Sequence, residues 1–285
     1  MGKSIAIIGS TGRNSSAWVN AFLAGGSHVR NLVRDPSKSQ PRSNLELVIF
    51  DLNNRSSYES ALSGIELLAL VTPPDPLQTE RELALIEAAK KVGIERIVNL
   101  SVLGADLPAP ISSFARWQAP VEAALKESGL PCVTLRPNSF MQNLLPQKAS
   151  IERGQYVEPS GDKPCSLIDV RDIADVAVAV SDGAYDGRSL NLTGPQALTG
   201  SDIAQILSAA RGHTVAFVSP PISDYRVALI DQGLPEWLVD ALVELYEAVQ
   251  GNRAGHLTRV TSEVEVMTGQ SPRTLGKFAQ EMFGH

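Results

Sequence analysis

The chain has 285 residues, of which 43% are hydrophobic and 20% are charged, and its formal net charge is −6. This composition is ordinary for a soluble globular protein, and the negative charge argues against nucleic acid as a general electrostatic partner. The two cysteines, Cys132 and Cys165, lack metal or redox spacing, which favours a reducing compartment. No apolar run approaches membrane-spanning length and no basic leader opens the chain, so we expect a cytoplasmic protein without a membrane partner.

The first fifteen residues predict a phosphate-binding turn. Residues 3–8 form an apolar, β-branched run, the sequence GSTGRNS follows over residues 9–15, and a helical pattern begins at Ala17. A strand, a glycine turn and a helix N-terminus together hold a diphosphate, because glycines allow close backbone approach and the first helical N–H groups attract negative charge. Ser15 stands where a third glycine is expected, and its small size makes this a tolerated variation.

The second predicted strand, His28–Val33, ends next to charged residues that bear on cofactor choice. In a dinucleotide-binding fold, an acidic residue here binds the ribose 2′-hydroxyl of NAD, whereas an arginine accommodates the 2′-phosphate of NADP. Arg34 is placed for the second role, with Arg13 or Lys38 assisting. Arg34 could instead be only a solvated residue. Asp35 keeps NAD open, although an Asp-Pro pair also suits the start of a helix.

Strands alternate with helices through the first half of the chain. This alternation predicts right-handed βαβ units and a parallel sheet, so the expected class is α/β with a Rossmann-type, doubly wound sheet. Further strands are predicted at residues 45–50, 66–71, 96–100 and 130–135, with helices at residues 56–62, 77–92 and 115–127.

The second half of the chain changes character and predicts a smaller lobe. Helices are expected from residue 169, over 199–212, over 235–249 and over 275–282, with one strand at Ser189–Leu192. We therefore expect an NAD(P)-binding Rossmann domain over residues 1–152 and a smaller α/β substrate-binding lobe over residues 153–285, interleaved with the first.

Several short motifs together resemble one family. Their order and spacing are similar to those of the NmrA-like group of atypical short-chain dehydrogenases/reductases, over nearly the whole chain. The motifs are IGSTG (8–12), LVRDPSK (32–38), SGLP (128–131), LRPNSFMQN (135–143), DVRDIA (169–174) and LTGP (192–195). The group includes quinone, triphenylmethane-dye, azo-dye and ergot-alkaloid iminium reductases, and also redox sensors that bind NADP without catalysis.

The resemblance implies which residues bind the cofactor, expected to be NADPH, with NADH the alternative. Residues in the glycine turn would hold the diphosphate, and loops after successive strands would hold the rest. The implied residues are Gly9, Ser10, Thr11, Gly12, Arg13 and Asn14 at the diphosphate, Arg34 at the 2′-phosphate, Asp51 and Leu52 at the adenine, Val71, Thr72 and Pro73 along the ribose, and Pro137, Asn138 and Phe140 near the nicotinamide.

The proton-donating Tyr-x-x-x-Lys pair of typical short-chain dehydrogenases is absent. Where the motif would fall, residues 113–118 read SFARWQ, and no tyrosine has a lysine four residues later. Reduction of a quinone, an iminium or a cationic dye places hydride on an already electron-poor centre, so positioning and desolvation matter most. Ser101, at the end of a predicted strand, is a candidate hydrogen-bond donor in catalysis; the alternative is a serine that satisfies local backbone.

Four aromatic residues are candidates for a substrate pocket above the nicotinamide, although aromatics at such positions are more often core. They are Trp117, Phe140, Tyr225 and Trp237. The four histidines are scattered without ligand spacing, so no metal site is expected.

These patterns favour an NADPH-dependent reductase that transfers hydride to a small, planar, electron-poor substrate. Two alternatives remain open at this point: an NADP(H)-sensing regulatory binding protein, and a non-redox enzyme such as a cyclase or isomerase on the same fold. The partner in the first case is a small molecule, and the sequence is compatible with a monomer or a homodimer.

Overall fold

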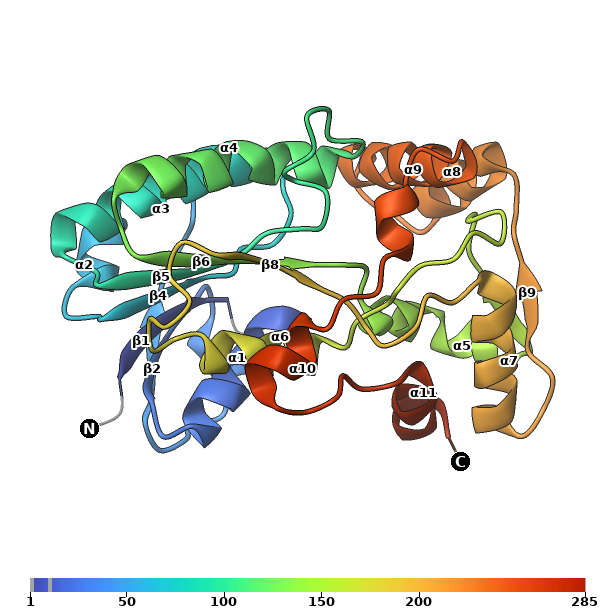
Figure 1. Ribbon diagram of the computed structural model, residues 1–285, viewed down its shortest axis with the longest axis horizontal. Coiled ribbons are helices and arrows are strands. Elements are labelled where there is room, and N and C mark those ends of the chain that lie inside the picture. The colour runs from blue at the N-terminus through green and yellow to red at the C-terminus, as the bar shows by residue number, and fades with distance from the viewer. Residues whose placement is uncertain (1–2, 10–11, 285) are drawn as a thin grey trace. The chain divides into compact units, whose positions relative to one another are not determined.

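The computed structural model describes residues 3–9 and 12–284, and Figure 1 shows the order of its elements. The chain divides into two compact units, each assembled from separated segments. Unit 1 comprises Met1–Ala105, Trp117–Arg136 and Val170–Leu190, and unit 2 comprises Asp106–Arg116, Pro137–Asp169 and Asn191–His285. Residue 152, where the sequence places a boundary, lies inside the second segment of unit 2.

Unit 1 is built on a seven-stranded sheet with the order β3-β2-β1-β4-β5-β6-β8, in which every pair from β3 to β6 is parallel. The order reverses at β1, which pairs with β2 on one side and β4 on the other, as in a Rossmann-type sheet. This confirms the predicted α/β class. The strands are β1 (Ser4–Ile8), β2 (His28–Val33), β3 (Leu45–Ile49), β4 (Leu67–Leu70), β5 (Arg96–Leu100), β6 (Cys132–Pro137) and β8 (Ser189–Leu192).

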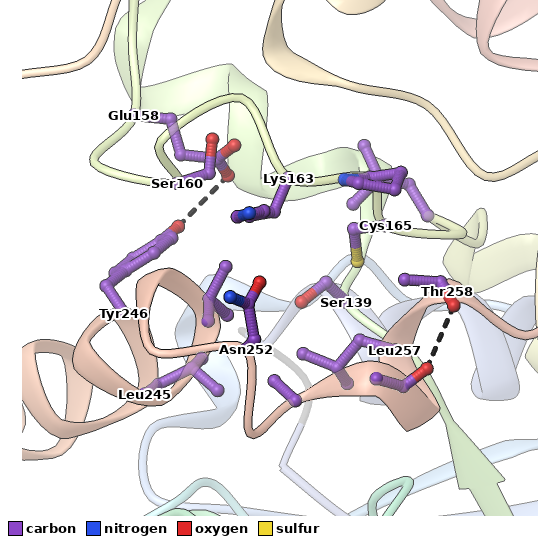
Figure 2. Close-up of a pocket in the computed structure, with 15 residues that line it drawn as sticks. Ser139, Glu158, Ser160, Lys163, Cys165, Leu245, Tyr246, Asn252, Leu257 and Thr258 are labelled. Atoms are coloured by element: carbon purple, nitrogen blue, oxygen red, sulfur yellow. Dashed lines mark hydrogen bonds between the residues drawn. The ribbon is translucent and has the colours of Figure 1, made fainter.

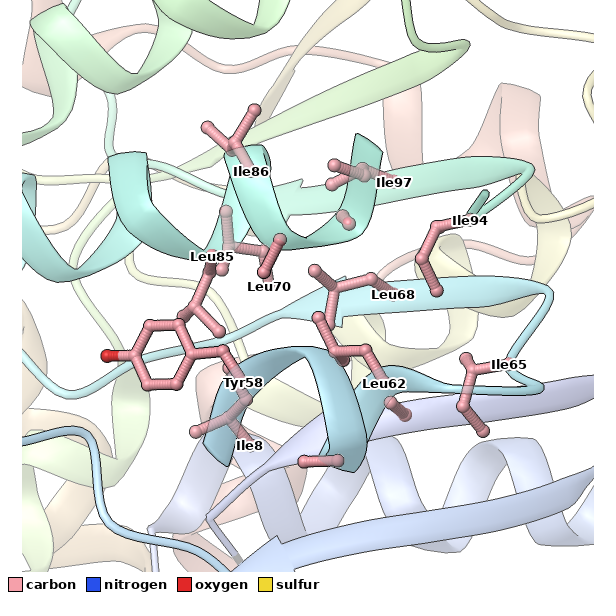
Figure 3. Packing of buried hydrophobic residues seen from close by; sticks show 14 of the residues in the cluster. Ile8, Tyr58, Leu62, Ile65, Leu68, Leu70, Leu85, Ile86, Ile94 and Ile97 are labelled. Carbon is pink, nitrogen blue, oxygen red and sulfur yellow. The ribbon is translucent and has the colours of Figure 1, made fainter. Parts of the chain in front are cut away.

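Helices bury both faces of this sheet, which explains why its strands read as continuous apolar runs rather than alternating ones. On one face, Tyr58 and Leu85 from two different helices pack with Leu68 of β4 in one hydrophobic cluster (Figure 3), which also includes Val121 and Ala6. A further pair of helices in unit 1, α1 and α6, pack against each other. The helices are α1 (Arg13–Ala24), α2 (Tyr58–Leu62), α3 (Gln78–Val92), α4 (Ser113–Ser128, whose first turn lies in unit 2) and α6 (Val170–Ala179).

Unit 2 has its own core around a two-stranded parallel sheet of β7 and β9. Tyr156, Leu207 and Phe278 are fully buried members of that core, and a smaller cluster around Val239 joins the two helices α8 and α9. Sequence patterns missed β7, β9, α8 and α10, because three-residue strands and short helices carry too few positions to show a period. The elements are α5 (Lys148–Glu152), β7 (Gln155–Val157), α7 (Gly200–Arg211), β9 (Ala216–Val218), α8 (Ile222–Asp231), α9 (Glu236–Gln250), α10 (Glu263–Thr268) and α11 (Leu275–Phe283).

No helix within the described part of the chain combines the length and apolarity that crossing a membrane requires.

A buried ion pair fixes the end of β6 within unit 1. Glu122 of α4 and Arg136 of β6 have side chains only 5% and 6% exposed, and the Arg136 Nε lies 2.9 and 3.1 Å from the two carboxylate oxygens. The Ser101 hydroxyl donates to the same carboxylate at 2.5 Å. Removing one member of such a pair leaves a buried charge without its main counter-charge.

We expect Glu122→Ala to lower the free energy of unfolding by about 3–5 kcal/mol, because Arg136 would lose the carboxylate that offsets its burial. The matched control is Glu46→Ala, which breaks the Arg30–Glu46 pair, where Glu46 is 55% exposed. That change should cost less than about 1 kcal/mol. Urea denaturation of both variants measures the difference, and equal losses would contradict this account of β6.

Candidate functional site

The predicted phosphate-binding turn joins β1 to α1 at the carboxyl edge of the sheet. Gly9 has a φ of +81°, a conformation that residues with a Cβ rarely adopt, and its N–H donates to the Leu32 carbonyl at 2.7 Å. Gly12 caps the N-terminus of α1, which begins at Arg13. Ser10 and Thr11 lie outside the described residues, as does the side chain of Arg13.

Ser15 takes over the packing role of the missing third glycine. Its buried hydroxyl donates to the Ile8 carbonyl at 2.9 Å and so ties the first turn of α1 to the end of β1. A Cβ added at Gly9 or Gly12 would lie 3.6 Å from the Ser15 Oγ, an ordinary van der Waals contact, so the need for glycine at Gly9 comes from its positive φ. The serine therefore strengthens the helix–strand contact that the predicted motif needs.

One polar atom in the turn has no protein partner. The Oδ1 of Asn14 is buried and accepts no hydrogen bond from any described residue. Buried polar atoms in folded proteins are nearly always satisfied, so an unsatisfied one beside a helix N-terminus is consistent with a ligand that supplies the donor. The residues present thus fit a dinucleotide whose diphosphate faces the turn and whose ribose supplies a hydroxyl donor to the Asn14 Oδ1.

Arg34 and Asp35 separate into different roles at the end of β2. Arg34 is exposed, and its side chain makes no hydrogen bond or ion pair with any residue in the described ranges. The Asp35 carboxylate instead caps the 3₁₀ turn Pro36–Lys38: it accepts from the N–H and the hydroxyl of Ser37 at 3.0 and 2.6 Å. These bonds lower the pKa of Asp35. Lys38 is also exposed, 3.8 Å from Asp35.

The other cofactor candidates of unit 1 follow the neighbouring strands. Asp51 and Leu52 come after β3, where Asp51 accepts from the Asn53 N–H at 2.9 Å. Val71, Thr72 and Pro73 come directly after β4, which pairs with β1. Because parallel strands share one carboxyl edge, the sheet order places these loops on the two sides of the glycine turn.

Thr72 is held by a buried carboxylate that the sequence analysis did not single out. Glu82 of α3 is fully buried; it accepts hydrogen bonds from the Thr72 hydroxyl, from the Gln78 amide at 3.1 Å and from the Gln118 amide at 3.0 Å. Burial raises the pKa of Glu82 to about 7, against the three hydrogen bonds that lower it. A signal was present: Glu82 stands on the apolar face of its helix, three and four residues before Leu85 and Ile86.

Ser101 is committed to the Glu122–Arg136 pair. Its side chain is 6% exposed and its proton is directed at the Glu122 carboxylate. A hydroxyl has one proton, so in this arrangement it donates to Glu122 and not to a substrate. The sequence offered one non-catalytic alternative, in which the Ser101 hydroxyl bonds to local backbone. In the structure the hydroxyl bonds to the Glu122 side chain instead. The catalytic role of Ser101 stays a prediction.

The candidates near residue 138 belong to unit 2. The Asn138 amide donates to the Ser166 hydroxyl and to the Leu257 carbonyl, both at 2.7 Å, and its oxygen accepts from the Ser139 N–H at 2.8 Å. Phe140 forms an isolated parallel bridge with Ile168. Pro137 ends β6. Asn138 therefore holds three segments of unit 2 together.

The four aromatic candidates lie on different elements. Trp117 is in α4 of unit 1, where its carbonyl accepts from Thr79 at 2.6 Å. Tyr225 of α8 packs edge-on against Tyr246 of α9, with ring centroids 5.5 Å apart. Trp237 is half-buried in the first turn of α9, and Phe140 is half-buried beside β6.

Unit 2 contains a cavity of about 300 Å³ that no sequence pattern indicated (Figure 2). Its apolar wall includes Leu167, Leu245 and Leu257, and its polar side chains include Glu158 and Tyr246. Short-range patterns could not find it, because its lining comes from segments far apart in the sequence, such as those that carry Glu158 and Tyr246, 88 residues apart. Ser139, Ser160, Lys163 and Cys165 also line it.

Glu158 and Tyr246 are hydrogen-bonded at the edge of this cavity. The Tyr246 hydroxyl donates to the Glu158 Oε1 at 3.0 Å, as the dashed line in Figure 2 shows. Burial raises the pKa of Glu158, and the bond from Tyr246 works against that rise. Burial and the nearby Glu158 raise the pKa of the Cys165 thiol to about 12, so this cysteine is a thiol rather than a thiolate.

Within residues 3–9 and 12–284, no three His, Cys, Asp or Glu side chains gather closely enough to hold a metal ion.

We compare the free energy of unfolding of the wild-type protein with that of Glu82→Gln. The wild-type value minus the variant value should fall by about 3 kcal/mol as the pH rises from 4.5 to above 7. The pKa of Glu82 is higher in the folded than in the unfolded chain, so its contribution is complete at low pH and disappears as the pH passes the folded value. Urea denaturation across this range measures it. Glu87→Gln, an exposed change on the same helix, is the control, and a pH-independent difference for Glu82→Gln would refute the assignment.

Comparisons with known proteins agree over the whole chain. The NmrA-like family model matches residues 1–279. The chain is 34% identical over 280 residues to the NAD(P)H azoreductase of Xenophilus azovorans, with 97% of this chain and 96% of that protein covered.

The structure of an NADPH-dependent quinone oxidoreductase from Escherichia coli, complexed with NADPH, superposes with a TM-score of 0.86 at 25% identity, covering 98% of this chain and all of that one (100%). The transcriptional regulator NmrA with NADP shares the fold, with a TM-score of 0.81 at 19% identity and coverage of 99% and 96%. The chain belongs to the NmrA-like family, as the order of its motifs predicted.

Proposed function

We propose that this protein is an NADPH-dependent reductase that transfers hydride to a small, electron-poor acceptor such as a quinone, an azo compound or a cationic dye. The observation that carries the proposal is the strand–turn–helix of unit 1, with Gly9 at positive φ and Arg34 exposed at the end of the next strand. The similarity to an azoreductase over nearly the full length of both chains supports the same reading.

The residues of unit 1 divide the work of holding the nucleotide. The backbone at Gly9, Gly12 and Asn14 would receive the diphosphate, and the Arg34 guanidinium would pair with the 2′-phosphate. Asp51 and Leu52 would border the adenine, and Thr72 the ribose. The bound nucleotide would supply a hydride. The Oδ1 atom of Asp35 already accepts two hydrogen bonds from Ser37, which leaves Arg34 as the residue at this strand end that would contact the 2′-phosphate.

The acceptor would bind in the cavity of unit 2. Its walls are largely apolar, which suits a planar aromatic molecule, and a few polar side chains give it direction. The Ser160 hydroxyl is buried beside the Glu158 carboxyl group, whose pKa it lowers, so these two polar groups mark one side of the cavity. Ser139 joins the cavity to the Pro137–Phe140 segment, which we assign to the nicotinamide end of the cofactor.

Two free cysteines, Cys132 and Cys165, and the net charge of −6 support a cytoplasmic setting and a small-molecule partner rather than nucleic acid.

A panel of quinones, azo compounds and cationic dyes tests the activity directly. We expect NADPH oxidation, followed by its absorbance, to depend on at least one of these acceptors. Tight NADPH binding without turnover of any acceptor would contradict the reductase and favour a nucleotide sensor. Conversion of a compound without any cofactor would point to non-redox chemistry.

Arg34→Ala should weaken NADPH binding by about 10- to 100-fold and leave NADH binding little changed, because a charge-assisted bond to the 2′-phosphate is worth about 1.5–3 kcal/mol. Calorimetric titration with both nucleotides measures the two affinities. Arg42→Ala is the control, since Arg42 is an exposed arginine that bonds Asn20 before β3. An equal loss for both nucleotides would show that Arg34 does not read the phosphate.

A further inference from the structure

A carboxyl group with an unusual environment lines the unit 2 cavity. Glu158 follows β7 directly, and its N–H donates to the Val218 carbonyl of β9 at 3.1 Å. The next residue, Pro159, accepts from the Gln250 amide of α9 at 2.9 Å. The backbone on both sides of Glu158 is therefore held by secondary structure, and the side chain has a defined direction.

The partners of this carboxyl group are neutral. Tyr246 donates to one of its oxygens, and no cation lies within ion-pair distance of it among the described residues, although Lys163 reaches into the same cavity (Figure 2). The hydroxyl groups of Tyr156 of β7 and Ser160 also interact with the carboxyl group. The other titratable groups around it are Tyr225 of α8 and Cys165. This differs from Glu122, whose carboxylate is neutralised by Arg136.

A buried carboxyl without a cation keeps its proton to higher pH than an exposed glutamate does. The direction of the pKa shift at Glu158 agrees, since burial raises the pKa. Three neutral hydroxyl groups, those of Tyr246, Tyr156 and Ser160, interact with the carboxyl group and work against that rise. The carboxyl group lines the cavity, where a bound molecule can reach it.

We propose that Glu158 is the general acid that protonates the reduced acceptor, and that Tyr246 is the residue that positions it. The proposal rests on the reductase function above. It gives the protein a proton donor in place of the Tyr-x-x-x-Lys pair that its sequence lacks.

The step balances for an azo acceptor as follows. One nitrogen of the N=N bond gains hydride, with two electrons, from the reduced nucleotide, and the π electrons move to the other nitrogen. That nitrogen takes the proton of the Glu158 carboxyl, so an N–H bond forms, an O–H bond breaks and Glu158 is left as a carboxylate. Solvent returns a proton to Glu158, the azo compound is reduced to a hydrazo compound, and the nucleotide is oxidised. A cationic triarylmethane dye differs, because hydride addition to its central carbon gives a neutral product that needs no proton.

This difference between acceptors provides the test. Glu158→Gln keeps the shape of the side chain and its ability to accept from Tyr246, but it has no acidic proton. With NADPH saturating, we expect kcat for a neutral azo compound or a quinone to fall about 100-fold, which is the usual contribution of a general acid. The kcat for a cationic triarylmethane dye should change little. Glu247→Gln, an exposed change next to Tyr246, is the matched control for both acceptors.

The Tyr246→Phe variant tests whether Tyr246 positions Glu158 or only stabilises the fold. The measurement is the dependence of kcat on pH. The acid form of Glu158 is the active one, so kcat for the azo compound or quinone falls as pH rises through its pKa. The bond from Tyr246 favours the carboxylate, and its loss should move this fall to higher pH by about one unit. A purely structural role would lower kcat at all pH values without moving the profile.

A second measurement does not depend on turnover. In the difference spectrum between the wild-type protein and Glu158→Gln, one infrared carbonyl band of a protonated carboxyl should remain, because the band of Glu82, which both proteins share, cancels. In Tyr246→Phe this band should titrate at higher pH.

The outcomes distinguish the two proposals. A wild-type protein that reduces no acceptor overturns the reductase function itself. A wild-type protein that reduces azo compounds or quinones, together with a Glu158→Gln variant that is as active, or is impaired equally on all acceptors, overturns the role of Glu158 alone. A wild-type protein that reduces only the cationic dye also overturns that role, because no proton would then be required.

Discussion

The parallel pairing of β1 with both β2 and β4 is the constraint on which the nucleotide site depends. It brings the ends of three strands to one edge of the sheet, so the glycine turn after β1 lies between the loops that carry Arg34 and Thr72. The pairing also needs both faces of the sheet to be covered, and the helices of unit 1 supply that cover with residues such as Leu85 and Trp18. The same burial therefore stabilises the sheet and positions the site.

Three buried or part-buried glutamates show how the surroundings of one residue type set its chemistry. Glu122 faces Arg136, and this charge pairing makes it part of the framework. Glu82 has no cation beside it, only a threonine hydroxyl and two glutamine amides, and burial raises its pKa to about 7 against these three bonds. Glu158 accepts from the Tyr246 hydroxyl, interacts with the hydroxyls of Tyr156 and Ser160, and lines the wall of a cavity. Of the three, Glu158 is the one that lines the cavity of unit 2 and has a pKa raised by burial.

Two departures from sequence rules acquire a physical explanation. Serine replaces the third glycine of the turn because its hydroxyl can bond the Ile8 carbonyl, which glycine could not do. The absent Tyr-x-x-x-Lys pair does not leave unit 2 without acidic groups. A tyrosine and a glutamate 88 residues apart in sequence meet there instead, and a motif defined by short spacing cannot describe such a pair.

The sequence by itself determined the Rossmann-type sheet, the position of its first six strands, the glycine turn and the family. It also predicted a strand at Ser189–Leu192 but assigned it to the smaller lobe, whereas this strand is β8 at the edge of the seven-stranded sheet. These depend on local periodicity, on Gly9 and on the order of short motifs, all of which can be read along the chain. Only the tertiary structure decided that the Asp35 carboxylate caps its own turn, that Ser101 bonds to Glu122, and that Glu158 and Tyr246 share a cavity. Whether a polar side chain is buried, and which residues face it, depends on contacts between distant segments, and a single sequence does not encode these in any local pattern.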